Sequence, residues 1–246
     1  MRELLLDADI LLYQVALKCE IEVDWGNDLW TLASDLKEAK QRLDIAMDEL
    51  MHNLDADLIT GALTEPNNFR KNLYPEYKAN RKDKRKPLGM KALREYYVAN
   101  YTTKVFPTLE ADDVLGILAT EPSKNERIIV SIDKDLGQIP SKLSVDQVTI
   151  TKTTKRLGDR LHLYQTLIGD TVDNYKGCPG VGPVKADKIL GKSCSWKSVV
   201  EAFAKMGLTE ADALVQARLA KILQHEDYNQ KTGEIKLWKS KYKSTM

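Results

Sequence analysis

The stretch LLLDADILLY, residues 4–13, contains the pattern on which the fold depends. Its three consecutive leucines fit a short strand that is buried on both faces, and Asp7 follows at once. A second apolar run covers residues 58–63, and the β-branched run RIIVSI covers residues 127–132. Helical patterns lie between these runs. Strands that alternate with helices predict an α/β fold with a mostly parallel central sheet flanked by helices.

The other expected elements are less sharply marked. Residues 66–90 are polar and basic and contain three prolines and a glycine, so we expect an excursion from the core that is only partly helical. The remaining elements follow from apolar spacing and β-branched runs. We expect helices over 28–54, 91–101 and 112–121, strands over 103–106 and 148–150, and mostly helix from 162 to 227.

The charge of the chain is unevenly distributed. The net charge is only +1 over 246 residues. Residues 70–94, however, hold ten lysines and arginines against two acidic residues, a net charge of +8. This asymmetry predicts that a polyanion binds the basic segment and that cations bind an acidic part elsewhere. No apolar run approaches the roughly 18 residues of a membrane span, so we expect a cytoplasmic protein.

Acidic residues gather in three short motifs, EADD, DKD and GDTVD, and behind the first strand. Carboxyl ends of parallel strands meet at one edge of a sheet, where ligands bind, so these side chains are expected to lie together. Carboxylates this dense repel one another unless cations neutralise them. Two or more Mg²⁺ or Mn²⁺ ions fit, because oxygen ligands dominate and no histidine or cysteine lies near. The candidate ligands are Asp7, Glu110, Asp112, Asp113, Asp133, Asp135, Asp170 and Asp173.

Each acidic motif also has a purely structural interpretation. A lone aspartate after a strand is often a helix N-cap, and an acidic pair in a first turn favours the helix dipole. One such pair alone would favour that interpretation. Four groups that converge on one sheet edge favour a metal centre instead.

Residues 177–190, GCPGVGPVKADKIL, form a glycine-rich turn before a predicted helix. Such a turn exposes backbone N–H groups that can hold a phosphate, and Lys185 and Lys188 add positive charge. The motif lacks the pattern of a Walker A loop or of a dinucleotide-binding fingerprint. It predicts binding of duplex phosphates without sequence preference; the alternative is a helix–helix connection that merely needs glycine. A larger side chain at Gly182 is expected to obstruct phosphate and to need a strained φ.

These motifs, in this order, resemble the flap endonuclease / 5′-3′ exonuclease family. The matching stretches are LLLDADILLY, YPEYKANRK, LEADDVLGILA, VSIDKDLGQI and GDTVDNYKGCPGVGPVKADKIL, spread over residues 1–190. The subgroup that the chain resembles most is the compact exonucleases of T7-like phages. The resemblance implies a PIN/FEN-like core over 1–160, which includes a basic helical arch at 66–90, and a helical H3TH part over 161–246 that binds duplex. It also implies a stand-alone nuclease without a polymerase domain.

The resemblance implies a role for each matching residue. Asp7, Glu110, Asp112 and Asp133 match the inner metal cluster, and Asp113, Asp135, Asp170 and Asp173 match the carboxylates that complete it and hold a second metal. Lys78 and Arg81 match basic residues that contact the scissile phosphate. The DNA-binding set adds Arg85 from the arch and Gly180, Gly182, Lys185 and Lys188 from the turn, where a K⁺ ion is implied. The implied activity is 5′-3′ hydrolysis of duplex DNA and RNA–DNA hybrids by a monomer in phage replication and recombination, alongside replication proteins.

One position departs from the family pattern. The family carries an aspartate after the second strand, where this chain has Glu65, whose longer side chain puts direct metal contact in doubt. Two alternatives stay open. A haloacid-dehalogenase-type phosphatase would use Asp7 as a nucleophile and Asp9 as a general acid. A catalytically silent DNA-structure-binding protein would share the fold without the chemistry.

Overall fold

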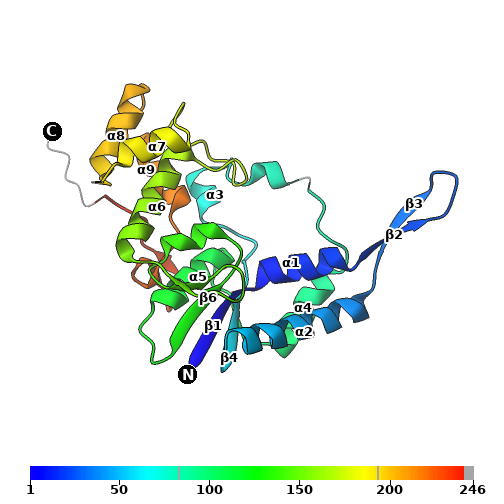
Figure 1. Cartoon of the computed structure of the whole chain (residues 1–246). Coiled ribbons are helices and arrows are strands. Elements are labelled where there is room, and N and C mark those ends of the chain that lie inside the picture. Colours follow the sequence, from blue (N-terminus) through cyan, green and yellow to red (C-terminus); the bar gives the residue numbers. More distant parts are fainter. Residues whose placement is uncertain (83, 193, 241–246) are drawn as a thin grey trace.

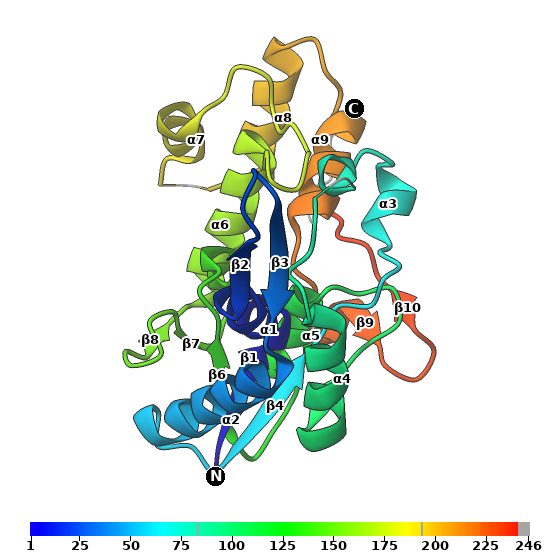
Figure 2. The ribbon, with the colours of Figure 1, turned by 90° about the vertical axis from the view of Figure 1, so that its right-hand side faces the viewer.

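The computed structural model describes residues 1–82, 84–192 and 194–240. A six-stranded sheet with the order β5-β4-β1-β6-β7-β8 forms its centre (Figures 1 and 2). Neighbouring strands pair in parallel, except for the antiparallel pair β7–β8. The predicted mostly parallel sheet is therefore confirmed. The strands are β1 (Arg2–Asp7), β4 (Leu58–Ala62), β5 (Thr103–Lys104), β6 (Glu126–Val130), β7 (Lys142–Ser144) and β8 (Thr151–Lys152).

Both faces of the central strands are buried, as the leucine run predicts. Leu4 and Leu6 point into a core shared with α1 (Ala8–Lys18), α2 (Leu36–Asn53) and α4 (Met90–Asn100). Leu5 points the other way, into a core shared with α5 (Ala111–Thr120). This alternation is the period of two that a strand imposes. Helices therefore cover the sheet on both sides.

The chain continues into a helical part with a core of its own. It comprises α6 (Lys155–Ile168), α7 (Pro183–Leu190), α8 (Trp196–Lys205) and α9 (Glu210–Ala220). The chain then forms η3 (His225–Asp227) and a small ribbon of β9 (Tyr228–Asn229) and β10 (Glu234–Ile235). Because α6 is continuous across residues 160–161, the predicted domain boundary falls inside a helix, and the helical part starts at Lys155. Within the described residues, no helix has the length and hydropathy that crossing a bilayer requires.

The expected helix over 28–54 is wrong in its first third. Strands β2 (Glu20–Asp24) and β3 (Trp30–Ser34) form an antiparallel hairpin that projects from the body, and α2 begins only after it (Figure 1). Asp35 stops the strand and starts the helix, because its side chain accepts hydrogen bonds from the N–H groups of Lys37 and Glu38. Leu29 and Leu32 continue the helical spacing of α2 by coincidence.

Three further expectations need correction or limits. Residues 66–90 are partly helical as predicted, with α3 (Arg70–Leu73) and η1 (Ala79–Arg81). The arch itself is not helical at residues 82 and 84–89, where Pro87 and the positive φ of Gly89 (73°) oppose a helix; Asp83 lies outside the described residues. The strand expected over 148–150 is instead β8, and its partner β7 was not predicted.

A neutral histidine is sealed into the helical part. His162 is 4% exposed, and its Nε2 lies 2.7 Å from the carbonyl oxygen of Ala217. The ring therefore donates a hydrogen bond from Nε2. Burial, together with the charge of Lys221, lowers the pKa of His162 to about 3. Protonation would place an unpaired charge in this core.

We expect this histidine to weaken the fold at acidic pH. An unfolded histidine has a pKa of about 6.5, so the unfolded state takes up the proton first, and the free energy of unfolding falls from about pH 6.5 down to about pH 3. His162→Gln keeps a donor for Ala217 but cannot titrate. Between about pH 7.5 and about pH 5.5, the wild type should lose about 1 kcal/mol more than the variant in urea unfolding. Equal pH dependence in the two proteins would contradict the assignment.

Candidate active site

Three carboxylates are brought to one edge of the sheet by the elements that precede them. Asp7 ends β1, where Oδ1 accepts from the Ile10 N–H at 3.2 Å. Asp133 follows β6, and Asp112 lies in the first turn of α5. Ser131 joins two of them, because its hydroxyl donates to Asp7 Oδ2 at 3.0 Å and accepts from the Asp133 N–H at 3.1 Å. The expected convergence at the carboxyl ends of the strands is present.

Burial and neighbouring negative charges make ionisation of this group unfavourable. Burial, and then the charges of Asp9 and Asp133, raise the pKa of Asp7 to about 7. Burial and the charges of Asp7 and Asp133 also raise the pKa of Asp112. Burial raises the pKa of Asp133 itself, with Asp173 and Asp170 adding to the effect. Ionised together, these groups need cations near them.

The arrangement differs from a fully protein-lined metal cage. Among the described residues, no three such side chains already converge on one point as a preformed cage would require. Magnesium is commonly held by one or two carboxylates, several waters and the phosphates of the substrate. A loose set of oxygen donors with raised pKa values meets that requirement, because a divalent cation would favour the ionised forms.

Glu110 differs from its neighbours because protein cations already surround it. Lys78 Nζ forms a short ion pair with Glu110 Oε1, and Arg70 Nη1 lies 3.6 Å from Oε2. The Tyr77 hydroxyl donates to Oε2 at 2.9 Å. Burial opposes ionisation, but the charges of Lys78 and Arg70 outweigh it and hold the pKa of Glu110 at about 2. Glu110 is therefore an ionised carboxylate that links the metal candidates to the base of the arch.

A second set of carboxylates lies between the sheet edge and α6. Burial, followed by the charge of Asp133, raises the pKa of Asp135 to about 7. Asp170 Oδ1 accepts from the N–H groups of Val172 and Asp173, at 2.6 and 3.2 Å, and so shapes its own loop. Asp173 Oδ1 pairs with Arg81 Nη2 at 2.6 Å.

The loop that carries Asp170 and Asp173 depends on two glycines that lie against each other. Gly169 and Gly177 have φ values of 71° and 63°. A Cβ on Gly177 would lie 2.3 Å from the backbone nitrogen of Gly169, which no side chain can do. The GDTVDNYKG motif is thus a closed loop that only glycine permits at both ends.

Asp113 departs from the expected role of metal ligand. It is fully buried and makes a bidentate ion pair with Arg70, at 2.6 and 2.8 Å. It also accepts from the Leu223 N–H at 3.0 Å. Arg70 donates to the carbonyl oxygens of Leu219 and Lys221 as well. Asp113 therefore joins α5 to the segment after α9, and its oxygens are taken up by these contacts.

The basic residues of the arch base are placed beside the carboxylates. Lys78 takes a left-handed conformation (φ 57°), its N–H donates to the Asp173 carbonyl at 2.9 Å, and its Nζ lies 3.4 Å from Asp173 Oδ2. Arg85 is further away and forms a bidentate pair with Glu20 instead. Glu65 accepts from the N–H groups of Asn67 and Thr108, so its carboxylate stabilises its own loop.

The glycine turn lies next to the second set of carboxylates. A hollow of about 380 Å³ separates them, and its lining includes Asp135, Asp170 and Gly182. Gly182 has an ordinary φ of −99°, so the expected strain is wrong there; Gly180 has the positive φ, 69°. A Cβ on either glycine would meet nothing within 4 Å, so the backbone at both is open to a ligand. Lys185 Nζ donates to the Gly180 carbonyl at 2.8 Å and holds the turn.

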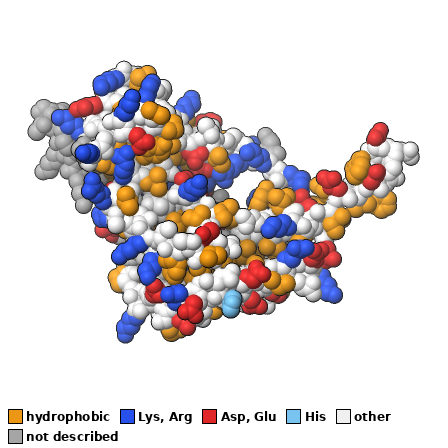
Figure 3. Space-filling view, viewed as in Figure 1, with side chains coloured by type: hydrophobic (Ala, Val, Ile, Leu, Met, Phe, Trp, Pro, Cys, Tyr) orange, Lys and Arg blue, Asp and Glu red, His pale blue; other side chains and the backbone are white. Residues whose placement is uncertain are grey.

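Cations surround this region of the surface. Figure 3 shows Lys and Arg side chains spread over the helical part, with Asp and Glu side chains among them beside the arch base. Among the described residues, Lys188 is exposed and makes no recorded side-chain pair. The turn, the hollow and the carboxylates therefore form one continuous path.

Sequence reasoning missed three residues of this site. Tyr77 is 2% exposed, and its hydroxyl lies within hydrogen-bonding distance of Glu110 and Asp173. Gln165 contacts Asp135 and is itself held by Gln138. Arg70 holds Asp113. Tyr77 and Arg70 lie in a segment that sequence reasoning interpreted only as basic, and a lone glutamine in a helix carries no signal that would single it out.

Comparison with known proteins decides the family. The model of the 5′-3′ exonuclease N-terminal resolvase-like domain matches residues 39–165. The exodeoxyribonuclease of Enterobacteria phage T3 is 32% identical over 96% of this chain and 92% of its own length. The chain is a member of the 5′-3′ exonuclease family. The resemblance to T7-like phage exonucleases is confirmed as well, because the exonuclease of Escherichia phage T7 is 30% identical over 96% of this chain and 93% of its own length.

Structural comparison agrees on the fold. The T5 D15 protein co-crystallised with metal ions matches with a TM-score of 0.65 at 15% identity, covering 90% of each chain. The flap endonuclease Xni of Shewanella oneidensis is 30% identical over 61% of this chain. This 5′-3′ exonuclease family member is therefore a nuclease with a FEN-like fold, as predicted.

Adjacent aspartates in this nuclease should respond in opposite ways to the same substitution. Asp113→Asn removes the bidentate partner of the buried Arg70 charge, which then keeps only the ion pair with Glu110 at 3.6 Å, and should cost about 3 kcal/mol of unfolding free energy. Asp112→Asn removes a repelled carboxylate and should leave that free energy unchanged or raised. Urea unfolding of both variants in EDTA measures the contrast. Similar stability losses in the two variants would contradict these separate roles.

Proposed function

We propose that this nuclease hydrolyses phosphodiesters from 5′ ends of duplex DNA, at flaps and in RNA–DNA hybrids, with two or more Mg²⁺ or Mn²⁺ ions. The observation that supports it most is that Asp7, Asp112 and Asp133 gather at one edge of the sheet, where burial and neighbouring negative charges raise the pKa of each. Relatives named exodeoxyribonuclease and flap endonuclease, and a T5 flap endonuclease complex with DNA and metal ions, support the substrate class.

The carboxylates and the basic residues of the site have different proposed roles, metal binding and stabilisation of the phosphate. Divalent ions bound here would activate a water and stabilise the attacking and leaving oxygens in the transition state of phosphoryl transfer. Asp7, Asp112 and Asp133 would hold the first ion with Glu110 nearby, and Asp135, Asp170 and Asp173 would hold the second. Lys78 and Arg81, now paired with carboxylates, would stabilise negative charge on the scissile phosphate once metal has neutralised those partners.

Binding of the duplex is assigned to the glycine turn, which lies across the hollow from the carboxylates. The open N–H groups at Gly180 and Gly182, with Lys185 and Lys188, would contact the phosphate backbone. A K⁺ ion at residues 177–182 stays a prediction of the family resemblance. So do a monomeric state, a role in phage replication and recombination, and contact with replication proteins.

The phosphatase alternative fits the geometry poorly. Asp9 would have to be free as a general acid. Its Oδ1 instead pairs with Arg94 at 2.7 Å, and its Oδ2 accepts from the Thr64 N–H at 2.7 Å. A catalytically silent protein is tested by the activity measurements below.

We expect turnover to depend on metal, on Asp133 and on Lys78. With a 5′-labelled duplex, a flap and a hybrid, cleavage should require Mg²⁺ and stop in EDTA. Asp133→Asn should remove most turnover but little binding, and Lys78→Ala should lower the single-turnover rate at saturating DNA by roughly 10²-fold. Exposed Asp48→Asn and Lys124→Ala are the matched controls. Wild-type rates in Asp133→Asn would refute the assignment.

The glycine turn should act on binding and not on chemistry. Gly182→Ala meets neither strain nor a clash in the free protein, so its stability should be unchanged while duplex affinity falls. Lys188→Ala should lower the magnitude of the log K versus log[salt] slope by about one unit. Binding is measured in Ca²⁺, and single-turnover rates at saturating DNA in Mg²⁺ should stay near wild type. An unchanged salt slope would show that Lys188 contacts no phosphate.

A further inference from the structure

The root of the β2–β3 hairpin binds the arch through Glu20, and these contacts of Glu20 with Arg85 and Leu88 are called the grip. Glu20, the first residue of β2, accepts from Arg85 Nη1 at 2.5 Å and Nη2 at 2.8 Å, and its Oε1 also accepts from the Leu88 N–H at 2.7 Å. The Glu20 side chain is only 8% exposed. The hydrogen bonds from Arg85 and Leu88 lower the pKa of Glu20 to about 2. One carboxylate thus holds two points of the arch segment, defined here as residues 82 and 84–89.

The opposite strand of the hairpin root touches the same segment. A Cβ on Gly89 would lie 3.2 Å from the Ser34 hydroxyl at the end of β3. Pro87, between Leu88 and the exposed residues 84–86, is buried. The arch segment therefore meets the body at the hairpin root, where α4 begins (Figure 1).

The other end of the arch segment is fixed by the active site. Lys78 and Arg81 pair with Glu110 and Asp173, and Asn80 donates to the Thr171 carbonyl at 3.0 Å. Between these two ends, the described residues 82 and 84–86 are exposed and form no helix. A segment without regular structure keeps its path only through its end contacts. The Glu20 contact is therefore decisive for where the segment lies.

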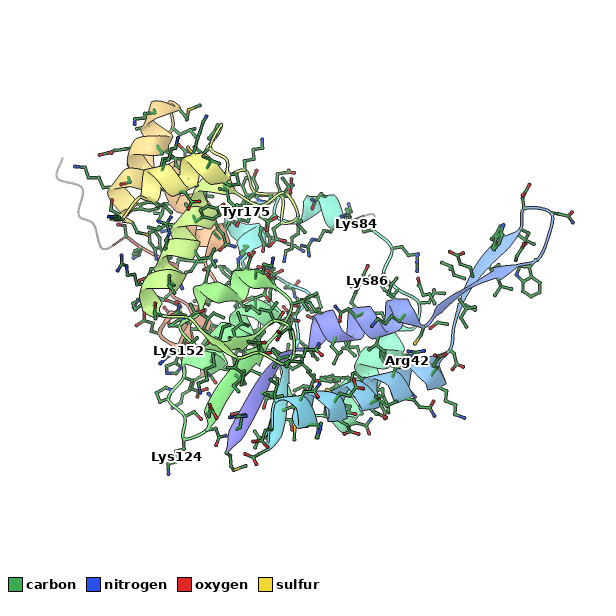
Figure 4. All side chains as sticks on the ribbon, in the orientation of Figure 1. Arg42, Lys84, Lys86, Lys124, Lys152 and Tyr175 are labelled. Carbon is green, nitrogen blue, oxygen red and sulfur yellow. The ribbon has the colours of Figure 1, made fainter. Side chains whose placement is uncertain are left out.

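The exposed part of the arch segment carries the charge that a nucleic acid would meet. Lys82, Lys84 and Lys86 are exposed, and Figure 4 shows Lys84 and Lys86 following each other along the segment above α1. The hairpin, by contrast, holds four acidic and no basic residues over 20–34. Only the arch segment, and not the hairpin, offers phosphate a favourable potential.

We propose that Glu20 is a positioning residue: by binding Arg85 and the Leu88 N–H, it holds the cationic arch segment where a single-stranded 5′ end of the substrate passes to the active site. The inference rests on the proposed function for its substrate, but the grip itself is measurable without turnover. Arg85 then serves chiefly as the anchor of the segment, which revises its expected role as a DNA contact.

The opposite reading makes Glu20 a mimic of phosphate that keeps Arg85 from DNA. Removing the carboxylate would then free a guanidinium and strengthen binding. The bond from the Leu88 N–H and the burial of Glu20 favour the grip, because a competing carboxylate would need neither. The two readings predict opposite changes in affinity.

The grip is tested first by limited trypsin digestion in the absence of DNA and metal. Glu20→Gln should speed cleavage after Lys84 and Arg85 by roughly 5-fold or more, since proteolysis follows the population of the open segment. Glu22→Gln removes the same charge two residues along β2, where Glu22 is exposed and, among the described residues, its side chain makes no hydrogen bond or ion pair; this variant should leave the rate unchanged. Arg85→Gln is the second variant and should speed cleavage after Lys84. Unchanged cleavage in both Glu20→Gln and Arg85→Gln would overturn the grip.

The functional part is tested by binding in Ca²⁺. Glu20→Gln should weaken binding of a duplex with a single-stranded 5′ tail by roughly 5-fold, and that of a blunt duplex by less than about 2-fold. Glu22→Gln should show neither loss. Tighter binding of the tailed substrate, or equal losses on both substrates, would overturn the proposal. If no variant and not even the wild type cleaves DNA, the proposed function fails, while the trypsin result still decides the grip.

Discussion

Repulsion among carboxylates that are forced together is the constraint on which the rest of this structure depends. Parallel strands end at one edge, so Asp7 and Asp133 meet there, and α5 adds Asp112. Burial, and after it the negative charges of neighbouring carboxylates, raise the pKa of each of these groups. Protein cations offset part of it, because Lys78 and Arg81 reach over from the arch base to Glu110 and Asp173. Lys78 and Arg81 therefore already lie beside the proposed position of the scissile phosphate.

A second electrostatic pair holds the two parts of the molecule together. The Arg70–Asp113 pair is buried, and its remaining hydrogen bonds go to the backbone around Leu219 and Leu223. A charge pair this deep adds little net stability by comparison with an apolar contact, but it penalises any arrangement that separates its partners. It therefore fixes the helical part, with the glycine turn, at a defined position relative to the carboxylates.

The sequence was sufficient for the central strands β1, β4 and β6 and for the meeting of Asp7 and Asp133 at their carboxyl ends, because apolar runs followed by aspartate report local pattern directly. It was insufficient where tertiary contacts decide. Leu29 and Leu32 fit a helix by spacing, yet the Gly26 turn and the Asp35 cap make a hairpin. Nothing in the sequence pairs Glu20 with Arg85, because the contact spans 65 residues. Asp113 was misjudged for the same reason: its partner, Arg70, lies in an unrelated segment.

The EADD motif shows how one helix start can serve several purposes. Successive residues of an α-helix point about 100° apart, so Asp112 and Asp113 cannot face the same neighbours. Asp112 turns toward Asp7 and Asp133, and Asp113 turns into the core toward Arg70. Glu110, before the first turn, reaches Lys78 and Tyr77. The Asp113–Arg70 ion pair thus fixes α5 one residue away from Asp112, a proposed metal ligand. The same helical turn therefore anchors the core and positions a carboxylate of the proposed active site.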